Sequence, residues 1–102
     1  MHFNQYQDAI NEFRLPTANI DYLVLGLIGE IGELYGHWAK DIRDDRPMDI
    51  AHEAKELGDI LWFVAAIAQD LGVSLDEIAT KNLEKLASRK ARGTIKGSGD
   101  NR

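Results

Sequence analysis

Residues 26–63, GLIGEIGELYGHWAKDIRDDRPMDIAHEAKELGDILWF, contain two pairs of acidic residues. Glu30 and Glu33 form the first pair, and Glu56 and Asp59 form the second. Within each pair the spacing is i, i+3, which on a helix places both carboxylates on one face. Four carboxylates on two facing helices would repel one another unless they were protonated or a cation lay between them. The stretch therefore favours two adjacent helices with a cation site between them, over the alternative that the acidic pairs lie on solvated helix faces.

The donor atoms of this predicted site are all oxygens, and the chain has no cysteine. Oxygen ligands suit a hard ion, Mg²⁺ or alternatively Mn²⁺, rather than zinc. A di-iron bundle would need a Glu-x-x-His motif from each of two helices, and the nearest pattern, Asp49-x-x-His52, occurs once. We interpret His37 and His52 as polar-face residues, with metal ligation as the alternative.

The composition is that of one ordinary domain. The chain has 102 residues, of which 44% are hydrophobic and 28% charged, and this length is typical of a single domain. The longest uncharged run, residues 60–69, is about half of what a membrane-spanning helix needs, and no signal sequence is apparent. We therefore expect a cytoplasmic protein with no membrane contact.

The net charge of −5 combines an acidic body with a basic C-terminal end. Residues 1–80 hold 15 acids and 5 bases, whereas residues 81–102 hold 2 acids and 7 bases. The basic end could contact nucleic-acid phosphates, but the body would repel a long polyanion, so nucleic acid is not the expected partner. A short polyphosphate is compatible with both the acidic body and the basic end, because a metal would bridge it to the acids while Lys and Arg contact it directly.

Apolar spacing predicts four helices and no strand. Pro16 ends the first helix, because the residue before a proline avoids the α region. Asn19 or Thr17 caps the second, Gly72 closes the third, and a capping box, S-L-D-E, opens the fourth. The predicted fold is all-α and four-helix bundle-like, with residues 1–92 as one domain and residues 93–102 as a flexible, glycine-rich basic tail. The expected helices cover residues 3–15, 20–45, 50–71 and 74–92.

The predicted third helix is apolar nearly all round between Leu57 and Ala68, which is typical of a central helix or a subunit interface. A chain of this size has too few elements to cover such a helix, so we predict a homo-oligomer, either a dimer or a tetramer. In the predicted second helix four glycines recur at helical spacing, and they would permit either close packing of a neighbouring helix or access of a ligand. These glycines are Gly26, Gly29, Gly32 and Gly36.

Two further patterns concern substrate binding. Trp62, like Trp38, could stack on a nucleobase or pack in the core, and we include Trp62 among the substrate-binding candidates. Lys81, Lys85, Arg89 and Arg92 recur at 4, 4, 3 and predict a basic ridge. Neither a phosphate-binding P-loop nor a nucleophilic triad is present.

Four segments resemble the MazG-like nucleoside triphosphate pyrophosphohydrolases, whose signature is ExxE followed by ExxD. Here 22 residues separate Glu33 from Glu56. The sequence departs from the family where many relatives have a further Glu, at Gly29, and it has one such domain where larger relatives have two. The segments are GEIGEL, ELGDILWFVAAIA, NLEKLASRKARG and GSGDNR.

The resemblance implies a MazG-type helical fold and hydrolysis of a (d)NTP to the monophosphate and pyrophosphate, in nucleotide-pool control or house-cleaning. It implies that Mg²⁺ is held by Glu30, Glu33, Glu56 and Asp59, with Glu33 or Glu30 acting on the attacking water. It also implies dimers or tetramers with the site near an interface. The nucleotide-contacting residues that it implies are Asn82, Lys85 and Arg89.

Two other functions fit the same sequence. A non-catalytic helical adaptor would bind a partner through residues 57–68 and nucleic acid through the tail, although it would have no need of convergent carboxylates. A related all-α hydrolase would act on a nucleoside diphosphate and release phosphate. The identity of the product, pyrophosphate or phosphate, separates the two enzymes.

Overall fold

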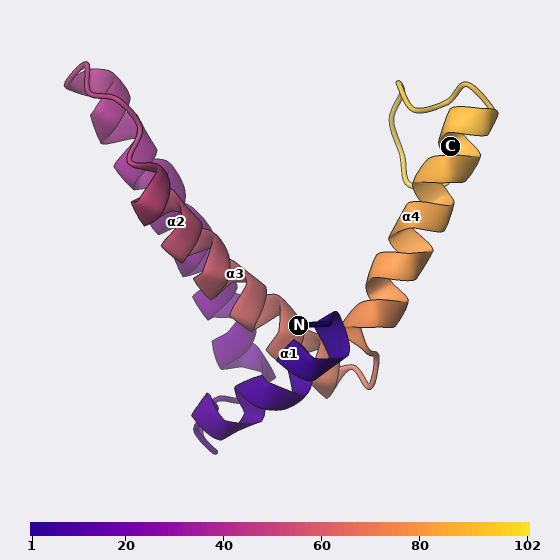
Figure 1. The fold of residues 1–102 in the computed structure, drawn as a ribbon, viewed down its shortest axis with the longest axis horizontal. Coiled ribbons are helices and arrows are strands. Elements are labelled where there is room, and N and C mark those ends of the chain that lie inside the picture. The colour runs from indigo at the N-terminus through magenta and orange to yellow at the C-terminus, as the bar shows by residue number, and fades with distance from the viewer.

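The computed structural model describes residues 1–102 and is entirely helical (Figure 1). Four α-helices and one short 3₁₀ helix account for the regular structure, and there is no strand. The all-α prediction is therefore confirmed. The elements are α1 (Phe3–Ala9), the 3₁₀ helix η1 (Ile10–Phe13), α2 (Ile20–Arg43), α3 (Ile50–Asp70) and α4 (Leu75–Ala91).

The helix boundaries follow from local capping. The Asn19 side chain accepts a hydrogen bond from the Tyr22 backbone N–H at 3.0 Å and begins α2. Gly72 has φ of +74° just beyond α3, where the left-handed conformation favours glycine. Its N–H donates to Gln69 O, and the next N–H, from Val73, donates to Ala68 O. This pair of bonds is a Schellman motif, which ends α3 and redirects the chain into α4.

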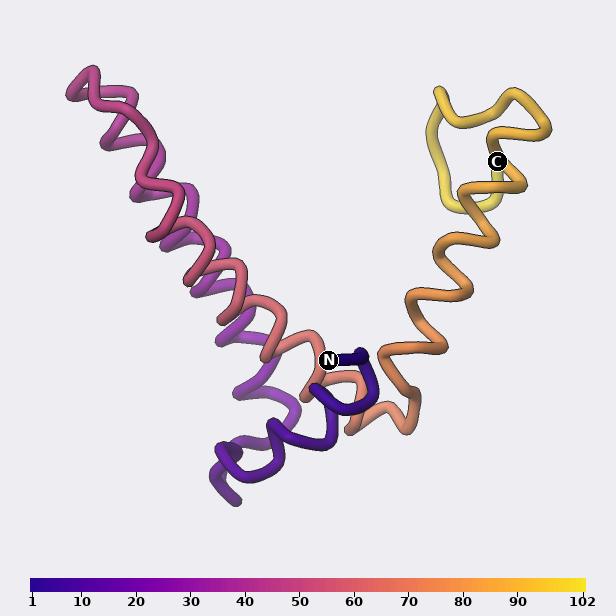
Figure 2. Tube along the Cα trace, viewed as in Figure 1, coloured from indigo at the N-terminus to yellow at the C-terminus, as the bar shows by residue number.

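The helices form an open V rather than a closed bundle (Figures 1 and 2). The antiparallel hairpin of α2 and α3 is one arm, α4 with the C-terminal tail is the other, and α1 lies at the base. The radius of gyration is 16.6 Å, whereas a compact domain of this length has about 13 Å. The predicted bundle is therefore not closed within one chain, because α4 diverges from the hairpin.

The core is small and lies at the base of the V. Only 12 of the 102 residues are buried, and Leu23 is the largest of them that is fully enclosed. Gln7 on α1 joins this base together: its side chain donates to Val73 O at 3.0 Å and accepts from the Leu75 N–H at 2.9 Å. One buried amide thus fixes α1 to the bend between α3 and α4.

The regular apolar seam of α3 lies mostly outside the core of the single chain. Its residues recur at alternating spacings of 4 and 3 and are Ile50, Ala54, Leu57, Leu61, Val64, Ala68 and Leu71. Leu57 is 56% exposed and Leu61 37% exposed, whereas Phe63, on the opposite ridge, is buried. The seam predicted from the sequence therefore identifies an apolar face without identifying what covers it, because periodicity reports polarity and not partners. Larger exposed apolar faces of this kind mark interaction surfaces.

No single helix is long and apolar enough to cross a bilayer, and α3 and α4 meet that criterion only when they are counted together across a bend of 101°.

The glycines of α2 differ in their surroundings. A Cβ added at Gly26 would collide with the edge of the Phe63 ring, whereas one added at Gly29, Gly32 or Gly36 would meet nothing within 4 Å. Gly26 therefore permits the close approach of α2 and α3. Helix packing within the chain explains this glycine but not the other three.

Gly26→Ala is expected to destabilise the protein although alanine favours helix. The added methyl displaces the buried Phe63 ring, and overpacking of a core costs about 1–3 kcal/mol, against a gain in helix propensity of about 1 kcal/mol. Gly29→Ala, with open space around it, should instead be neutral or stabilise by up to about 1 kcal/mol. Urea midpoints of the two variants measure the difference, and equal midpoints would contradict the packing role of Gly26.

Candidate functional site

Three carboxylates converge between the two helices of the hairpin. Glu30 and Glu33 project from α2 and Glu56 projects from α3, and one carboxylate oxygen of each lies within 4.8 Å of the others. The i, i+3 spacing on α2 places its two acids side by side, and the antiparallel pairing brings Glu56 to them. We call these three residues the acidic trio.

The acidic trio is electrostatically strained in the absence of a cation. Burial raises the pKa of Glu30, and the neighbouring carboxylates raise it further: Glu33, Asp59 and Glu56 by their charges, and Glu56 also as the partner of a hydrogen bond from protonated Glu30. Both effects disfavour the charged form of a carboxylate. A divalent ion among the three oxygens would reverse both effects, because it attracts the charges that otherwise repel one another.

The residues of the acidic trio fit a hard divalent ion. Glu30 Oε2 and Glu56 Oε2 are both buried without a hydrogen-bond partner, and an unmatched buried acceptor is costly. The donor set contains only carboxylate oxygens, which Mg²⁺ and Mn²⁺ prefer. Orphaned acceptors and ligand chemistry therefore both indicate a cation at this position.

Asp59, the fourth predicted ligand, stands slightly apart. Its charge lies near enough to raise the pKa of Glu30. The pKa of Tyr6 is also raised, mainly by burial and to a smaller extent by the charge of Asp59. Its carboxylate is nevertheless not part of the three-oxygen cluster, and the residue is exposed. The structure thus brings three of the four predicted acids together and places the fourth beside them.

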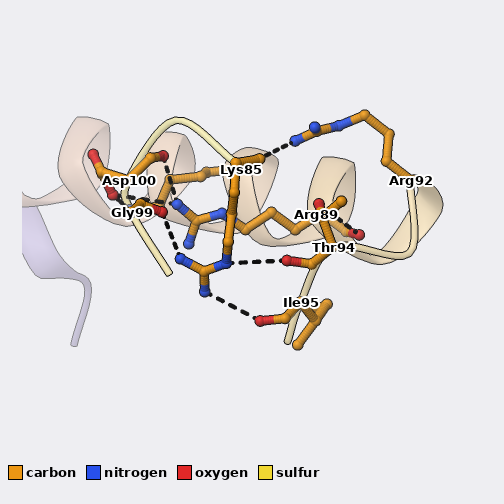
Figure 3. Close-up of polar contacts among 8 residues, drawn as sticks. Lys85, Arg89, Arg92, Thr94, Ile95, Gly99 and Asp100 are labelled. Atoms are coloured by element: carbon orange, nitrogen blue, oxygen red, sulfur yellow. Dashed lines mark hydrogen bonds and ion pairs between the residues drawn. The ribbon is translucent and has the colours of Figure 1, made fainter. Parts of the chain in front are cut away.

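The predicted phosphate-binding residues lie on the other arm of the V. Lys85 and Arg89 project from α4, where both contact Asp100 of the C-terminal tail (Figure 3). Lys85 Nζ lies 3.1 Å from Asp100 Oδ1, and Arg89 Nη2 donates to the Asp100 carbonyl at 2.6 Å. These two cations hold the pKa of Asp100 below its usual value, with the Lys85 hydrogen bond as the largest cause.

The tail, residues 93–102, is folded back along α4. Arg102 donates to the carbonyls of Thr94 and Ile95 at 3.0 and 3.1 Å, and its own carbonyl accepts from Arg92 at 2.7 Å. Arg89 is only 5% exposed beneath this fold. Lys85 and Arg89, the cations predicted to bind phosphate, therefore both contact the anionic side chain of Asp100 in this structure.

The remaining predicted substrate residues lie in different hollows. Asn82 and Lys85 border a hollow of about 340 Å³ on α4. Trp62 is half-buried, packs edge-on against Phe63 with ring centroids 5.2 Å apart, and lines a separate hollow of about 170 Å³. One chain therefore does not bring Trp62, Asn82 and the acidic trio into one pocket. The other residues around Trp62 in its hollow are Phe13, Leu15, Thr17, Ala18 and Tyr22.

His37 and His52 are more closely associated than the sequence interpretation suggested. Their rings stack with centroids 3.8 Å apart between α2 and α3. Two buried carboxylates, Asp41 and Glu53, accompany them, and the sequence analysis did not single these out. The sequence did contain a signal for Asp41, because it follows His37 at i, i+4 and so shares its helix face.

The fold and the acidic trio together define an all-helical protein with a candidate hard-cation site on a helical hairpin. The chain belongs to the MazG family: residues 19–93 match the model of the MazG nucleotide pyrophosphohydrolase domain. It is 40% identical, over 115 aligned residues that span both chains completely, to the protein named "Gene 37 protein" of Mycobacterium phage L5. No solved structure matches the chain. The resemblance identified from the sequence is therefore confirmed at the level of the family.

Proposed function

We propose that this protein is a Mg²⁺-dependent nucleoside triphosphate pyrophosphohydrolase, with Mn²⁺ as an alternative ion, that converts a (d)NTP to the (d)NMP and pyrophosphate. The observation that carries the proposal is the acidic trio with its unmatched buried oxygens. Membership of the MazG family supports the reaction class. The cellular role that follows is control of the nucleotide pool or removal of unwanted nucleotides in the cytoplasm.

In this proposal Glu30 and Glu56 hold the ion through their buried oxygens, and Asp59 supports it from the edge of the site. Bound Mg²⁺ supplies charge neutralisation for the triphosphate and a lowered pKa for coordinated water. Glu33, the exposed member of the acidic trio, orients the attacking water or accepts its proton. Glu30 is the less suitable base, because the proposal already uses its carboxylate to hold the ion.

We further propose that the active form is a homo-oligomer, a dimer or a tetramer. The support is the open V, the exposed α3 seam, and the separation of the acids from Lys85 and Arg89 on different arms. A second copy seated against the seam would cover apolar surface and bring basic side chains of one chain to the acids of the other. Asn82 and Trp62 complete the proposed substrate-binding set.

The decisive experiment is an assay of product identity. The full chain is incubated with Mg²⁺ and a panel of (d)NTPs, and pyrophosphate, phosphate and nucleotide products are separated. Monophosphate with equimolar pyrophosphate supports the proposal. Release of phosphate from nucleoside diphosphates would assign the protein to the related all-α hydrolases. No turnover with any nucleotide would favour the non-catalytic helical adaptor.

Lys85→Ala is expected to raise KM about tenfold or more, because a charge-assisted hydrogen bond to phosphate contributes about 1.5–3 kcal/mol. Lys90→Ala, which removes another lysine of α4, is the matched control and should leave kcat/KM unchanged. Steady-state kinetics with a preferred (d)NTP measure both. Equal kcat/KM for Lys85→Ala and the wild type would exclude Lys85 from the binding site.

A further inference from the structure

A second group of metal-ligating side chains lies next to the acidic trio, toward the turn between α2 and α3. His37 and Asp41 come from α2, and His52 and Glu53 come from the first turns of α3. The proposed hydrolysis uses none of them. We propose that these four residues bind a second divalent ion, a transition metal of the zinc class, which joins the two helices of the hairpin.

The distances within this group are close to those of a coordination sphere. His37 Nδ1 lies 3.0 Å from Glu53 Oε1 and 3.6 Å from Asp41 Oδ2. One ligand atom each of His37, His52 and Glu53 lies within 4.8 Å of the others. Ligands around tetrahedral zinc, at bond lengths of about 2.0–2.2 Å, lie about 3.4 Å apart. Three of the four side chains, His37, His52 and Glu53, therefore already lie together, and Asp41 adjoins them through His37.

The two carboxylates of the group are buried and incompletely paired. Asp41 is 5% exposed and Glu53 7% exposed, and Asp41 Oδ2 and Glu53 Oε2 have no hydrogen-bond partner. Arg46 lies 3.4 Å from the other Asp41 oxygen, Oδ1, so it leaves Oδ2 free. A buried carboxylate whose charge is only partly compensated is costly, and a cation placed between Asp41 and Glu53 would complete the compensation.

A proton does not satisfy this group as well as a metal ion does. The single N–H at Nδ1 of His37 can serve Glu53 Oε1, but Asp41 Oδ2 and Glu53 Oε2 still lack a partner. Protonation of both His37 and His52 would place two positive rings 3.8 Å apart, where like charges repel. In the proposed site one divalent ion would take both imidazoles and both carboxylates as ligands.

The donor atoms select a different ion from that of the acidic trio. Imidazole nitrogen with carboxylate oxygen suits Zn²⁺ and neighbouring transition metals, whereas oxygen alone suits Mg²⁺ or Mn²⁺. A hollow of about 330 Å³ opens onto His37 and Asp41 and gives a hydrated ion a route from solvent. Contact between His52 Nε2 and Glu56 Oε1 at 3.4 Å links the two groups. The hairpin therefore carries two adjacent sites of distinct ligand chemistry.

The test is a titration of the full chain with Co²⁺, a spectroscopic substitute for Zn²⁺, in excess Mg²⁺ so that the acidic trio is occupied. Nitrogen-ligated tetrahedral Co²⁺ gives a visible absorption band. One equivalent per chain, displaced by Zn²⁺, is expected. His37→Gln and His52→Gln should each weaken Co²⁺ binding at least about tenfold, since even outer-sphere partners contribute 10–100-fold. Asp41→Asn, which keeps the side-chain volume, should weaken it as well.

His2→Gln and Glu33→Gln are the matched controls and should bind Co²⁺ like the wild type. Far-UV circular dichroism shows whether each variant keeps its helices. Absence of the band in the wild type, or unchanged affinity in folded His37→Gln and His52→Gln, would overturn the site. The readout is metal binding and is therefore independent of hydrolysis. A chain that does not hydrolyse nucleoside triphosphates but still binds Co²⁺ through these histidines would contradict only the proposed function.

Discussion

Glu30→Gln is expected to reduce pyrophosphate release by about a hundredfold to a thousandfold. The substitution keeps the shape of the side chain but removes one of the three charges that would hold the ion. Metal stabilisation of developing phosphate charge contributes several kcal/mol, and each 1.4 kcal/mol is tenfold in rate. Steady-state assay of pyrophosphate with saturating Mg²⁺ measures the loss. Asp59→Asn should lower the rate less, because Asp59 lies outside the three-oxygen cluster.

The loss should occur without unfolding. The raised pKa of Glu30 means that the metal-free folded state binds its proton more tightly than the unfolded chain does. Stability therefore falls as pH rises from the ordinary glutamate pKa through the raised value, and Gln removes this dependence. Metal-free Glu30→Gln should accordingly melt no lower than the wild type at pH 8.

Glu84→Gln, an exposed acid of α4, is the matched control for the assay and should retain full activity. If Glu30→Gln were folded and as active as the wild type, the acidic trio could not be the catalytic metal site.

Leu57→Asp is expected to dissociate the proposed homo-oligomer to chains of 11.4 kDa and to abolish the proposed activity with it. In the single chain Leu57 is 56% exposed, and a substitution at such a position normally changes stability by within about 0.5 kcal/mol. If the α3 seam is covered by a second copy, the same aspartate becomes a buried, unpaired charge in the interface, which is severely destabilising. Sedimentation equilibrium or light scattering measures the mass of each form.

Leu57→Met separates the loss of apolar contact from any other effect at this position. Methionine conserves volume and polarity, and such exchanges usually cost under about 1.5 kcal/mol, so this variant should remain associated and active. A wild-type protein that sediments as a single chain at assay concentration and still hydrolyses (d)NTPs would show that the seam is not an obligatory interface.

Much of the local structure could be predicted from individual residues. Asn19 and Gly72 act through the backbone within a few positions of themselves, so their capping and stopping roles were readable directly. The i, i+3 spacing of Glu30 and Glu33 fixed their common face for the same reason. These effects depend on geometry within one or two helical turns. The first helix was expected to run to Pro16, but α1 ends at Ala9 and only the 3₁₀ helix η1 continues to Phe13.

The histidine group and the core needed information from distant parts of the chain. Nothing in the sequence near His37 shows that its ring stacks on His52 or that Glu53 approaches its nitrogen, because these contacts depend on the register of α2 against α3. That register depends in turn on Gly26, whose missing side chain accommodates Phe63. Likewise, the seam containing Leu57 could be recognised as apolar, but its exposure depends on the direction that α4 takes after Gly72.

The sequence by itself determined that this chain is all-helical, approximately where α2, α3 and α4 begin and end, that it belongs to the MazG family, and that two acidic pairs face the same way on their helices. Only the tertiary structure decided that three of those acids converge, that two histidines join two buried carboxylates, and that the basic residues lie on a separate arm folded under the tail. The physical reason is range: capping and helical periodicity act over a few residues, whereas convergence, burial and charge compensation depend on how whole helices pack.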